Sequence, residues 1–389
     1  MRIILLTTKL NFKTGGGSVT DLHLKAKGLA ELGHEVSVVT TRSAANSVDR
    51  ELPYAVYEDD VDSRHFIRSQ YSTYRLIKKY ENKADIFYID GNNFLYGGGV
   101  YKLLGGRVPL AAFFNMRLNC WRDPEMKAEN FFSRAKRKLR FFLERWIGNP
   151  VVVRMETFIY NTPMLAEVYY GFGHKKKKSF IVEDMVNTLD IIKKLQVSPE
   201  MIRARQTGQN KIIIYCSGRL LREKGFDLVI QAVGALKSKN KYQFIIGGTG
   251  PDENRLKKMA ADLKLEKYID FPGWLEKEKM YENLSQAHIF IFPKWWSEYG
   301  SVVLTEAMAM GLPCLVPAGG ALEWLSMGGF LPFAPDNYND LAKRIEELGA
   351  SADLRIKLGI GGLRKAEELD YKKLVIKLEK AMIFAQNKE

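Results

Sequence analysis

The strongest constraint on the fold of this chain is a repeated alternation between short apolar runs and segments with helical periodicity. Arg2–Thr7 and Glu35–Thr40 are apolar runs of the length expected for buried parallel strands. Between them, Val19–Leu32 has apolar residues at helical spacing, and the Gly33-His34 pair ends that segment. Together they predict a strand–helix–strand unit, from which parallel sheets are built.

The alternation continues through the first half of the chain and restarts in the second. Further strands of the first half are expected at Ile86–Ile89, Leu110–Phe114 and Phe180–Val182. In the second half, strands are expected at Ile212–Cys216, Gln243–Ile246, Ile269–Phe271, Ile289–Phe292 and Cys314–Val316, with helices at Asp227–Lys237, Glu253–Leu263, Lys277–Ser285 and Val302–Met310. The sequence therefore predicts an α/β protein with two Rossmann-like, doubly wound parallel sheets.

A polar, helix-like stretch at residues 187–210 separates the two series of strands. We expect a first domain over residues 1–187, a second over residues 188–370, and a terminal helix, residues 371–389, that packs back on the first domain. Two such domains facing each other make a cleft. Open α/β sheets bind ligands beyond the carboxyl ends of their strands, so functional residues are expected in the loops that follow each strand.

The composition limits the class of protein. Apolar residues make up 46% of the 389, which is enough for two buried cores. The three cysteines, Cys120, Cys216 and Cys314, form no CxxC pair, which argues against a disulfide framework or a zinc site and favours a reducing compartment. No run approaches the roughly 20 apolar residues that span a membrane, and the first run is too short for a signal peptide. We therefore expect a cytoplasmic protein, soluble or bound at the inner face of the membrane.

The net charge of +14 is compatible with nucleic acid, anionic lipid or a phosphorylated substrate as partner. No nucleic-acid-binding module is recognisable, so no nucleic-acid partner is expected. Residues 133–146 combine a dense positive charge with apolar residues at helical spacing, namely Leu139, Phe142, Leu143 and Trp146. This segment predicts an interfacial helix for an anionic membrane or, alternatively, a helix packed on the sheet with a solvated basic face.

Two basic residues follow the first strand of the second half. Arg219 and Lys224 lie in the run Ser217–Gly225 and border the start of a helix. Two cations beside a helix N-terminus suit a diphosphate, whereas the alternative is a solvated basic loop. The run Gly247–Pro251 follows the next strand and allows either a close approach of the backbone to a ligand or a plain turn into a helix.

The run from Ser297 to Pro313 carries two carboxylates. Glu298 lies in the loop after the strand Ile289–Phe292, and Glu306 lies inside the helix that begins near Ser301. A carboxylate in so apolar a helix is costly unless it is paired or binds a ligand. Carboxylates accept hydrogen bonds from sugar and ribose hydroxyls. The two carboxylates are therefore candidates to bind these hydroxyls. Alternatively, Glu298 caps the helix and Glu306 is paired within the fold.

The order of these motifs resembles the retaining GT-B glycosyltransferases of family 4, also called glycosyl transferases group 1. The resemblance rests on Arg219 and Lys224 upstream of Glu298-x7-Glu306, and it extends to the first strand–helix–strand unit. It implies an acceptor-binding first domain and a second domain that binds a nucleotide-sugar donor. By the resemblance, Arg219 and Lys224 hold the donor diphosphate, Glu306 binds the ribose hydroxyls, and Glu298 binds the transferred sugar.

The resemblance also implies roles for smaller residues. The backbone of Gly300, Ser301 and Val302 would reach the phosphate or the sugar, and Trp274 would lie by the nucleobase. The donor would also be approached by three glycines, Gly16, Gly17 and Gly248. Such enzymes need no metal or other cofactor, because the cations and the helix dipole neutralise the leaving diphosphate.

One position departs from the family. Its members often have a histidine after a strand of the first domain, near the reacting centre. Here Leu110–Phe114 is followed by Asn115 and Arg117, and none of the five histidines follows such a strand. Asn115 and Arg117 are the candidates for the acceptor side.

The expected function is a retaining, metal-independent transfer of a hexose-type sugar from a nucleotide-diphosphate sugar to a glycan or lipid-linked acceptor, with the leaving phosphate as base. Two alternatives remain: a sugar-nucleotide epimerase on the same scaffold, and a non-catalytic nucleotide-sugar binder. An epimerase would release free sugar and nucleotide without an acceptor.

Overall fold

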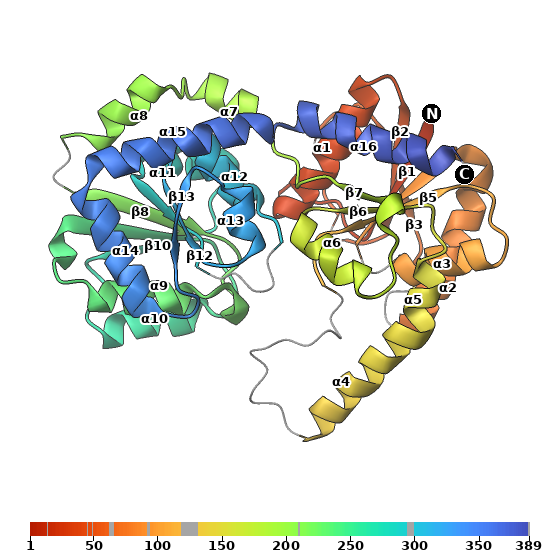
Figure 1. Cartoon of the computed structure of the whole chain (residues 1–389), viewed down its shortest axis with the longest axis horizontal. Helices are drawn as coiled ribbons and strands as arrows, with labels where there is room; N and C mark the ends of the chain where they lie inside the picture. Colours follow the sequence, from red (N-terminus) through yellow and green to blue (C-terminus); the bar gives the residue numbers. More distant parts are fainter. Residues whose placement is uncertain are drawn as a thin grey trace. The chain divides into compact units, whose positions relative to one another are not determined.

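The computed structural model of the protein describes residues 1–13, 15–44, 46–48, 50–61, 66–91, 94–117, 131–208, 211–293 and 299–387. At residues 66, 131–134, 137 and 140 it describes the backbone only. Within these residues the chain divides into two compact units (Figure 1). Unit 1 comprises Met1–Met185 and Tyr371–Glu389, and unit 2 comprises Val186–Asp370.

Unit 1 contains a parallel sheet of seven strands in the order β3-β2-β1-β4-β5-β6-β7. The strands are β1 (Arg2–Thr7), β2 (Glu35–Thr41), β3 (Ala55–Asp59), β4 (Ile86–Asp90), β5 (Leu110–Phe114), β6 (Thr157–Tyr160) and β7 (Ser179–Ile181). The helices are α1 (Gly17–Glu31), α2 (Phe66–Tyr80), α3 (Leu95–Leu103), α4 (Phe131–Leu143), α5 (Asn149–Val152), α6 (Pro163–Tyr170) and α16 (Tyr371–Gln386), with the short turns η1 (Glu81–Lys83), η2 (Glu144–Gly148) and η3 (Lys176–Lys178). The strand order reverses between β1 and β4, which marks the crossover where ligands bind in such sheets.

The terminal helix α16 is part of unit 1. Its residues Tyr371, Leu374, Val375 and Leu378 are buried in one apolar cluster with α1 and the sheet. Gly28 of α1 lies against Val375, where a Cβ would approach a side-chain carbon to 2.8 Å. His34 adds a hydrogen bond of 2.8 Å to Glu379, so polar and apolar contacts both hold α16 on this unit (Figure 1).

Unit 2 contains a second parallel sheet, of six strands in the order β10-β9-β8-β11-β12-β13. The strands are β8 (Ile212–Ser217), β9 (Tyr242–Gly247), β10 (Ile269–Gly273), β11 (Ile289–Ile291), β12 (Cys314–Pro317) and β13 (Phe330–Phe333). The helices are α7 (Thr188–Lys194), α8 (Pro199–Gln206), α9 (Phe226–Ala235), α10 (Glu253–Asp262), α11 (Lys277–Gln286), α12 (Val302–Ala309), α13 (Ala321–Leu325), α14 (Tyr338–Ala350) and α15 (Ala352–Glu368), with the turns η4 (Arg222–Lys224) and η5 (Lys239–Lys241). Here the crossover lies between β8 and β11.

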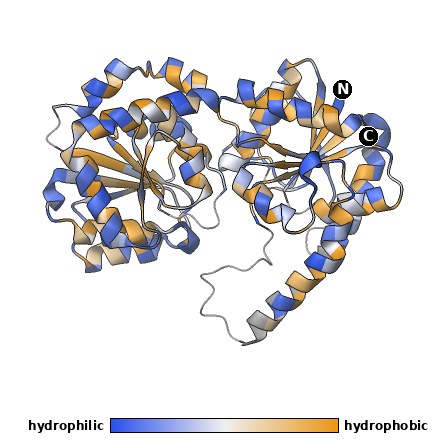
Figure 2. Ribbon diagram, viewed as in Figure 1, coloured by the Kyte–Doolittle hydropathy of each residue, from blue (hydrophilic) through white to orange (hydrophobic). Residues whose placement is uncertain are grey.

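The predicted fold class is confirmed, since both sheets are parallel and doubly wound. The strands are mostly apolar and lie between helices of mixed polarity (Figure 2). Every strand expected from the sequence is present, but β3, β6 and β13 were not predicted. The edge strand β3 is largely exposed and ends in Glu58 and Asp59, and the edge strand β13 contains Pro332, a residue that argues against a central strand.

Candidate functional site

The two predicted diphosphate ligands lie in the loop that leaves β8, at the carboxyl end of the strand nearest the crossover. Arg219 is exposed, and Lys224 is partly buried at the end of η4. Gly225 follows in the left-handed conformation (φ 72°) and forms the N-cap of α9. The structure therefore places both cations at the carboxyl edge of the unit 2 sheet, beside a helix start, as the sequence predicted.

The loops that follow β8, β9 and β10 are joined by backbone hydrogen bonds. Gly218 N–H donates to Gly247 O at 3.1 Å, and Gly248 N–H donates to Gly273 O at 2.8 Å. A Cβ on Gly248 would lie 1.9 Å from Gly218 O, and one on Gly250 would lie 2.2 Å from Leu220 O. These glycines are thus required by the packing of one loop on the next, and a contact between Gly248 and the donor stays a prediction.

The N-terminus of α12 lies across the crossover from the Arg219 loop. The Ser301 side chain caps the helix by accepting a hydrogen bond from Leu304 N–H at 3.1 Å. The N–H groups of Val302 and Val303 precede the first intrahelical bond, from Thr305 N–H to Ser301 O. Gly300 and Val302 are partly exposed. Backbone donors and the positive end of the helix dipole therefore face the carboxyl edge of the sheet.

Glu306 lies on the same helix with its side chain 5% exposed. Tyr281 O–H of α11 donates to its Oε1 at 2.9 Å, and Lys277 Nζ lies 3.5 Å from the same atom. Burial raises the pKa of the Glu306 carboxyl, against the opposing effects of Lys277 and Tyr281. The protein itself therefore provides partners for this buried carboxylate. Tyr281 and Lys277 were missed from the sequence, because nothing in their spacing links them to a residue so far along the chain.

The remaining predicted residues of unit 2 are Trp274 and Glu298. Trp274 follows β10 directly, and its side chain is 45% exposed, so it is available to a ligand at this edge. Glu298 lies outside the described residues. Its expected contact with the transferred sugar stays a prediction.

In unit 1, Gly16 is the N-cap of α1 and Gly17 is its first residue. A Cβ on Gly16 would meet nothing within 4 Å, whereas one on the preceding Gly15 would lie 2.0 Å from Asn11 O. Packing therefore requires a glycine at position 15. It does not require one at position 16, so the predicted approach of Gly16 to the donor stays a prediction. Asn115 and Arg117 follow β5 and are both partly exposed at the carboxyl edge of the unit 1 sheet.

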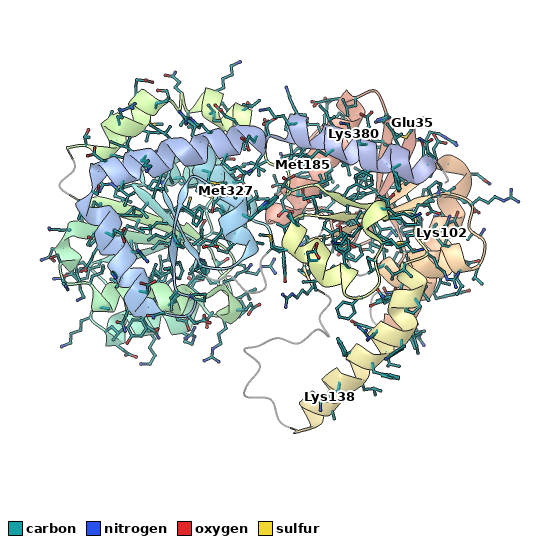
Figure 3. All side chains as sticks on the ribbon, in the orientation of Figure 1. Glu35, Lys102, Lys138, Met185, Met327 and Lys380 are labelled. Carbon is teal, nitrogen blue, oxygen red and sulfur yellow. The ribbon has the colours of Figure 1, made fainter. Side chains whose placement is uncertain are left out.

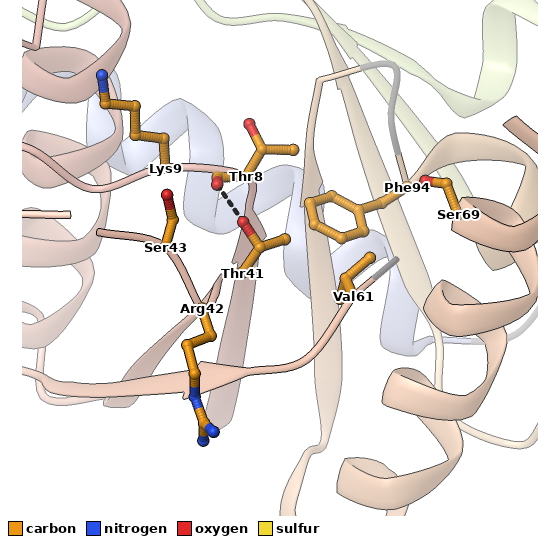
Figure 4. A pocket seen from close by; sticks show the side chains of 8 residues that line it. All are labelled: Thr8, Lys9, Thr41, Arg42, Ser43, Val61, Ser69 and Phe94. Atoms are coloured by element: carbon orange, nitrogen blue, oxygen red, sulfur yellow. Dashed lines mark hydrogen bonds between the residues drawn. The ribbon is translucent and has the colours of Figure 1, made fainter. Parts of the chain in front are cut away.

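A hollow of about 290 Å³ opens at the carboxyl ends of β1 and β2 (Figure 4). Its lining residues are Thr8, Lys9, Thr41, Arg42, Ser43, Val61, Ser69 and Phe94. The Thr41 hydroxyl donates to Thr8 O at 2.5 Å, which ties the two strand ends together. Hydroxyls and two cations give this hollow a polar character, and no sequence motif pointed to it.

Three other features of the described residues bear on the chemistry. Within them no group of three or more histidine, cysteine or carboxylate side chains is arranged to hold a metal ion. Nor is any of their helices long and apolar enough to cross a bilayer. His174 and His288 are buried, with their pKa values lowered by desolvation to about 3 and about 4, so both are neutral structural groups.

Comparisons with known proteins cover both units. A family model described as Glycosyl transferases group 1 matches residues 197–363, and one described as Glycosyltransferase Family 4 matches residues 15–188. Mannosylfructose-phosphate synthase of Agrobacterium fabrum is 25% identical over 84% of this chain and 77% of that protein. The lipopolysaccharide core biosynthesis glycosyltransferase LpsE of Rhizobium meliloti is 24% identical over 53% of this chain and 58% of that protein.

Solved structures share the fold over nearly the whole chain. Sucrose-phosphate synthase of Thermosynechococcus elongatus has a TM-score of 0.76 at 16% identity and covers 97% of each chain. HepE of Anabaena, solved in complex with UDP, has a TM-score of 0.74 at 16% identity and covers 98% of this chain and 99% of that one.

Proposed function

We propose that this chain transfers a hexose-type sugar from a nucleotide-diphosphate sugar to a hydroxyl of a glycan or lipid-linked acceptor. The chain belongs to the GT-B glycosyltransferases, because a group 1 model matches its second half and a family 4 model matches its first half. The protein is a glycosyltransferase. The donor, the acceptor and the stereochemistry are the parts that we propose.

The observation that carries the proposal is the pairing of Arg219 and Lys224 with the N-terminus of α12 at the β8–β11 crossover of unit 2. A diphosphate needs cations and N–H donors on neighbouring elements, and this edge supplies both. Trp274 is exposed at the same edge, where it offers a stacking surface to a base.

The proposed chemistry follows from these charges. As the glycosidic bond of the donor breaks, negative charge develops on the diphosphate, and Arg219, Lys224 and the α12 dipole stabilise it without a metal. The departing phosphate takes the acceptor proton on the same face of the sugar, so the anomeric configuration is retained. Glu306 grips the ribose, and Glu298 orients the transferred sugar. Neither acts as a covalent nucleophile.

The test is a thermal-shift screen of the full chain against nucleotide sugars, followed by turnover assays with the one that binds. Arg219→Ala and Lys224→Ala should each weaken nucleotide binding and lower turnover by orders of magnitude. Arg203→Ala, a change at an exposed arginine of α8 outside this loop, is the control and should behave as wild type. Near-normal turnover of both site variants would overturn the proposed donor site. Conversion of the sugar to its epimer without an acceptor would favour an epimerase.

We further propose that residues 133–146 bind an anionic membrane surface. Four apolar side chains of this segment are largely exposed: Leu139, Phe142, Leu143 and Trp146, at 59%, 55%, 43% and 63%. This exposure supports the membrane-binding interpretation over the alternative, in which the helix packs on the sheet. Lys138 is exposed beside them (Figure 3), whereas the one acid here, Glu144, is buried. A solvent-exposed surface that is both basic and apolar suits the boundary between headgroups and acyl chains.

Vesicle cosedimentation tests this binding. The full chain should bind vesicles rich in phosphatidylserine at low salt and be released as salt rises, because surface attraction is screened. Exchanging both Leu143 and Trp146 for serine should abolish the binding. A matched exchange of the exposed Leu103 and Leu104, which lie at the end of α3, should leave it unchanged. No binding by the wild type at low salt would remove the proposal.

A further inference from the structure

The buried carboxylate of Glu306 is held by two side chains that the proposed chemistry does not use. Tyr281 O–H donates to Glu306 Oε1 at 2.9 Å, and Lys277 Nζ lies 3.5 Å from the same oxygen. No hydrogen bond from another described residue reaches this carboxylate. Because each carboxylate oxygen accepts two hydrogen bonds, Oε2 and part of Oε1 are left for a ligand.

Both partners come from one face of α11. Tyr281 and Lys277 lie one turn apart on this helix, so their side chains reach Glu306 together. Lys277 is half-exposed, and its Nζ lies 5.4 Å from the centroid of the Tyr281 ring. The Tyr281 ring packs against the apolar cluster that contains Leu304 and Ala307 of α12. Packing therefore fixes the ring, and the hydroxyl has a defined position from which to direct the carboxylate.

Two effects oppose each other at Glu306. Burial favours the neutral acid and raises the pKa of the Glu306 carboxyl, whereas the Lys277 charge and the Tyr281 hydroxyl favour the carboxylate. Burial and the Glu306 charge raise the pKa of the Tyr281 hydroxyl, so it keeps its proton and remains a donor. The other titratable groups that face this pair are Tyr215 of β8, Asp190 of α7 and Glu278 of α11. Of all these groups, Tyr281 and Lys277 are the ones that stabilise the carboxylate.

We propose that Tyr281 is a positioning residue for the donor: it anchors Glu306 Oε1 and turns the rest of the charged carboxylate toward the hydroxyls of the donor ribose. The inference rests on the proposed donor site and gives that site a preference for ribonucleotides that depends on Tyr281. Hydrogen bonds to a charged acceptor are about twice as strong as those to a neutral one. Without the Tyr281 hydroxyl, the buried Glu306 takes up a proton more readily and loses its fixed orientation. Lys277 acts in the same direction, but its half-exposed charge is screened.

The experiment measures by isothermal titration the affinity of the full chain for UDP, GDP and ADP, and for their 2′,3′-dideoxy forms. The wild type should bind the ribose form of one of these nucleotides about tenfold or more tighter than its dideoxy form, because the ribose hydroxyls then pair with a charged acceptor. Tyr281→Phe removes the hydroxyl and keeps the ring. It should reduce this ribose preference to about threefold or less, by weakening the ribose form and leaving the dideoxy form nearly unchanged.

The same ratio of affinities, measured against pH, separates a positioning role from a structural one. In the wild type the ribose preference should fall as pH falls, because Glu306 takes up a proton. In Tyr281→Phe this fall should begin about one pH unit or more higher, since the lost hydrogen bond favours the carboxylate. The diphosphate titrates equally in both nucleotides, so it does not affect the ratio. A change that only loosened the fold would weaken both nucleotides alike at every pH.

Two control variants complete the design. Tyr268→Phe removes a hydroxyl that donates to Asn240 Oδ1 at 2.8 Å, ahead of β9 and β10, and should bind as the wild type does at every pH. In a Glu306→Ala background no carboxylate remains to be positioned, so Tyr281→Phe should have no further effect on either nucleotide. Thermal unfolding of each variant verifies that it is folded at the temperature of the titration.

Three results would overturn the role of Tyr281: an unchanged ribose preference in Tyr281→Phe, an unchanged pH dependence of that preference, or a further effect of Tyr281→Phe in the Glu306→Ala background. A wild type that binds a nucleotide without any ribose preference would refute the ribose role of Glu306 together with this inference. A wild type that binds none of the nucleotides would refute the proposed donor site itself.

Discussion

Gly248 offers a direct test of the packing described for unit 2. It has a φ of +125°, and a Cβ at this position would lie 1.9 Å from Gly218 O. The exchange Gly248→Ala therefore forces two adjustments. The backbone is held in a region that costs a non-glycine residue about 1–3 kcal/mol, and the loops after β8 and β9 must separate.

The separation acts on two hydrogen bonds, Gly218 N–H to Gly247 O and Gly248 N–H to Gly273 O. Each contributes about 1 kcal/mol. The expected loss is therefore about 3–5 kcal/mol in the free energy of unfolding of unit 2. For a domain of this size, that loss lowers the melting temperature by roughly 10 °C. Thermal unfolding followed by circular dichroism measures it.

Gly234 is the matched control. It lies inside α9, and a Cβ there would meet only Leu265 Cδ1, at 3.9 Å. Gly234→Ala should stabilise the protein by about 0.5–1 kcal/mol, because alanine loses less conformational entropy in a helix. If Gly248→Ala melts within 2–3 °C of the wild type, the close approach of the two loops is wrong.

Three further predictions concern charge. Glu306→Gln keeps the hydrogen bond from Tyr281 but removes the carboxylate charge, so initial-rate kinetics should show a donor KM raised about tenfold with kcat nearly kept; an unchanged KM would contradict the ribose role. Burial raises the pKa of the Asp90 carboxyl to about 6, against the opposing effects of Lys25 and the Thr7 hydroxyl, while Asp21 raises it further. This group therefore lowers wild-type stability as pH rises from about 4 to about 6. Asp90→Asn should escape that loss and gain about 1–3 kcal/mol on the wild type over this range in pH-dependent melts; a constant difference would show that the carboxyl is not desolvated. Turnover should persist in excess EDTA, and a complete loss that added metal reverses would refute metal-free transfer.

The fold could be predicted from the sequence where buried strands are continuous apolar runs. Ile212–Cys216 and Cys314–Val316 are such runs, and both form central strands. The edge strand Ala55–Asp59 is largely exposed and ends in two carboxylates, Glu58 and Asp59, because one side of an edge strand is not covered by a neighbour. The strand Thr157–Tyr160 is interior and buried, but the sequence did not predict it.

The part of the candidate site that lies in local sequence motifs was predicted, and the part that depends on contacts between distant elements was not. Arg219 and Ser301 could be found because each follows a strand and borders a helix, and the structure has them there. The partners of Glu306 come from another helix, and only the packing of α11 on α12 brings them together. Lys25 and Asp21 look in sequence like an ordinary surface pair on a helix, so their complete burial could not be seen.

The central claim is that the β8–β11 crossover of unit 2 binds the diphosphate of a nucleotide sugar. Isothermal titration of the full chain with UDP, GDP and ADP sugars, compared between wild type and Arg219→Ala, tests it most directly. The account predicts saturable binding of one nucleotide sugar by the wild type and an affinity at least tenfold lower in the variant, since a charge-assisted contact is lost. Equal affinity in both proteins, or no binding of any nucleotide sugar by the wild type, would contradict it.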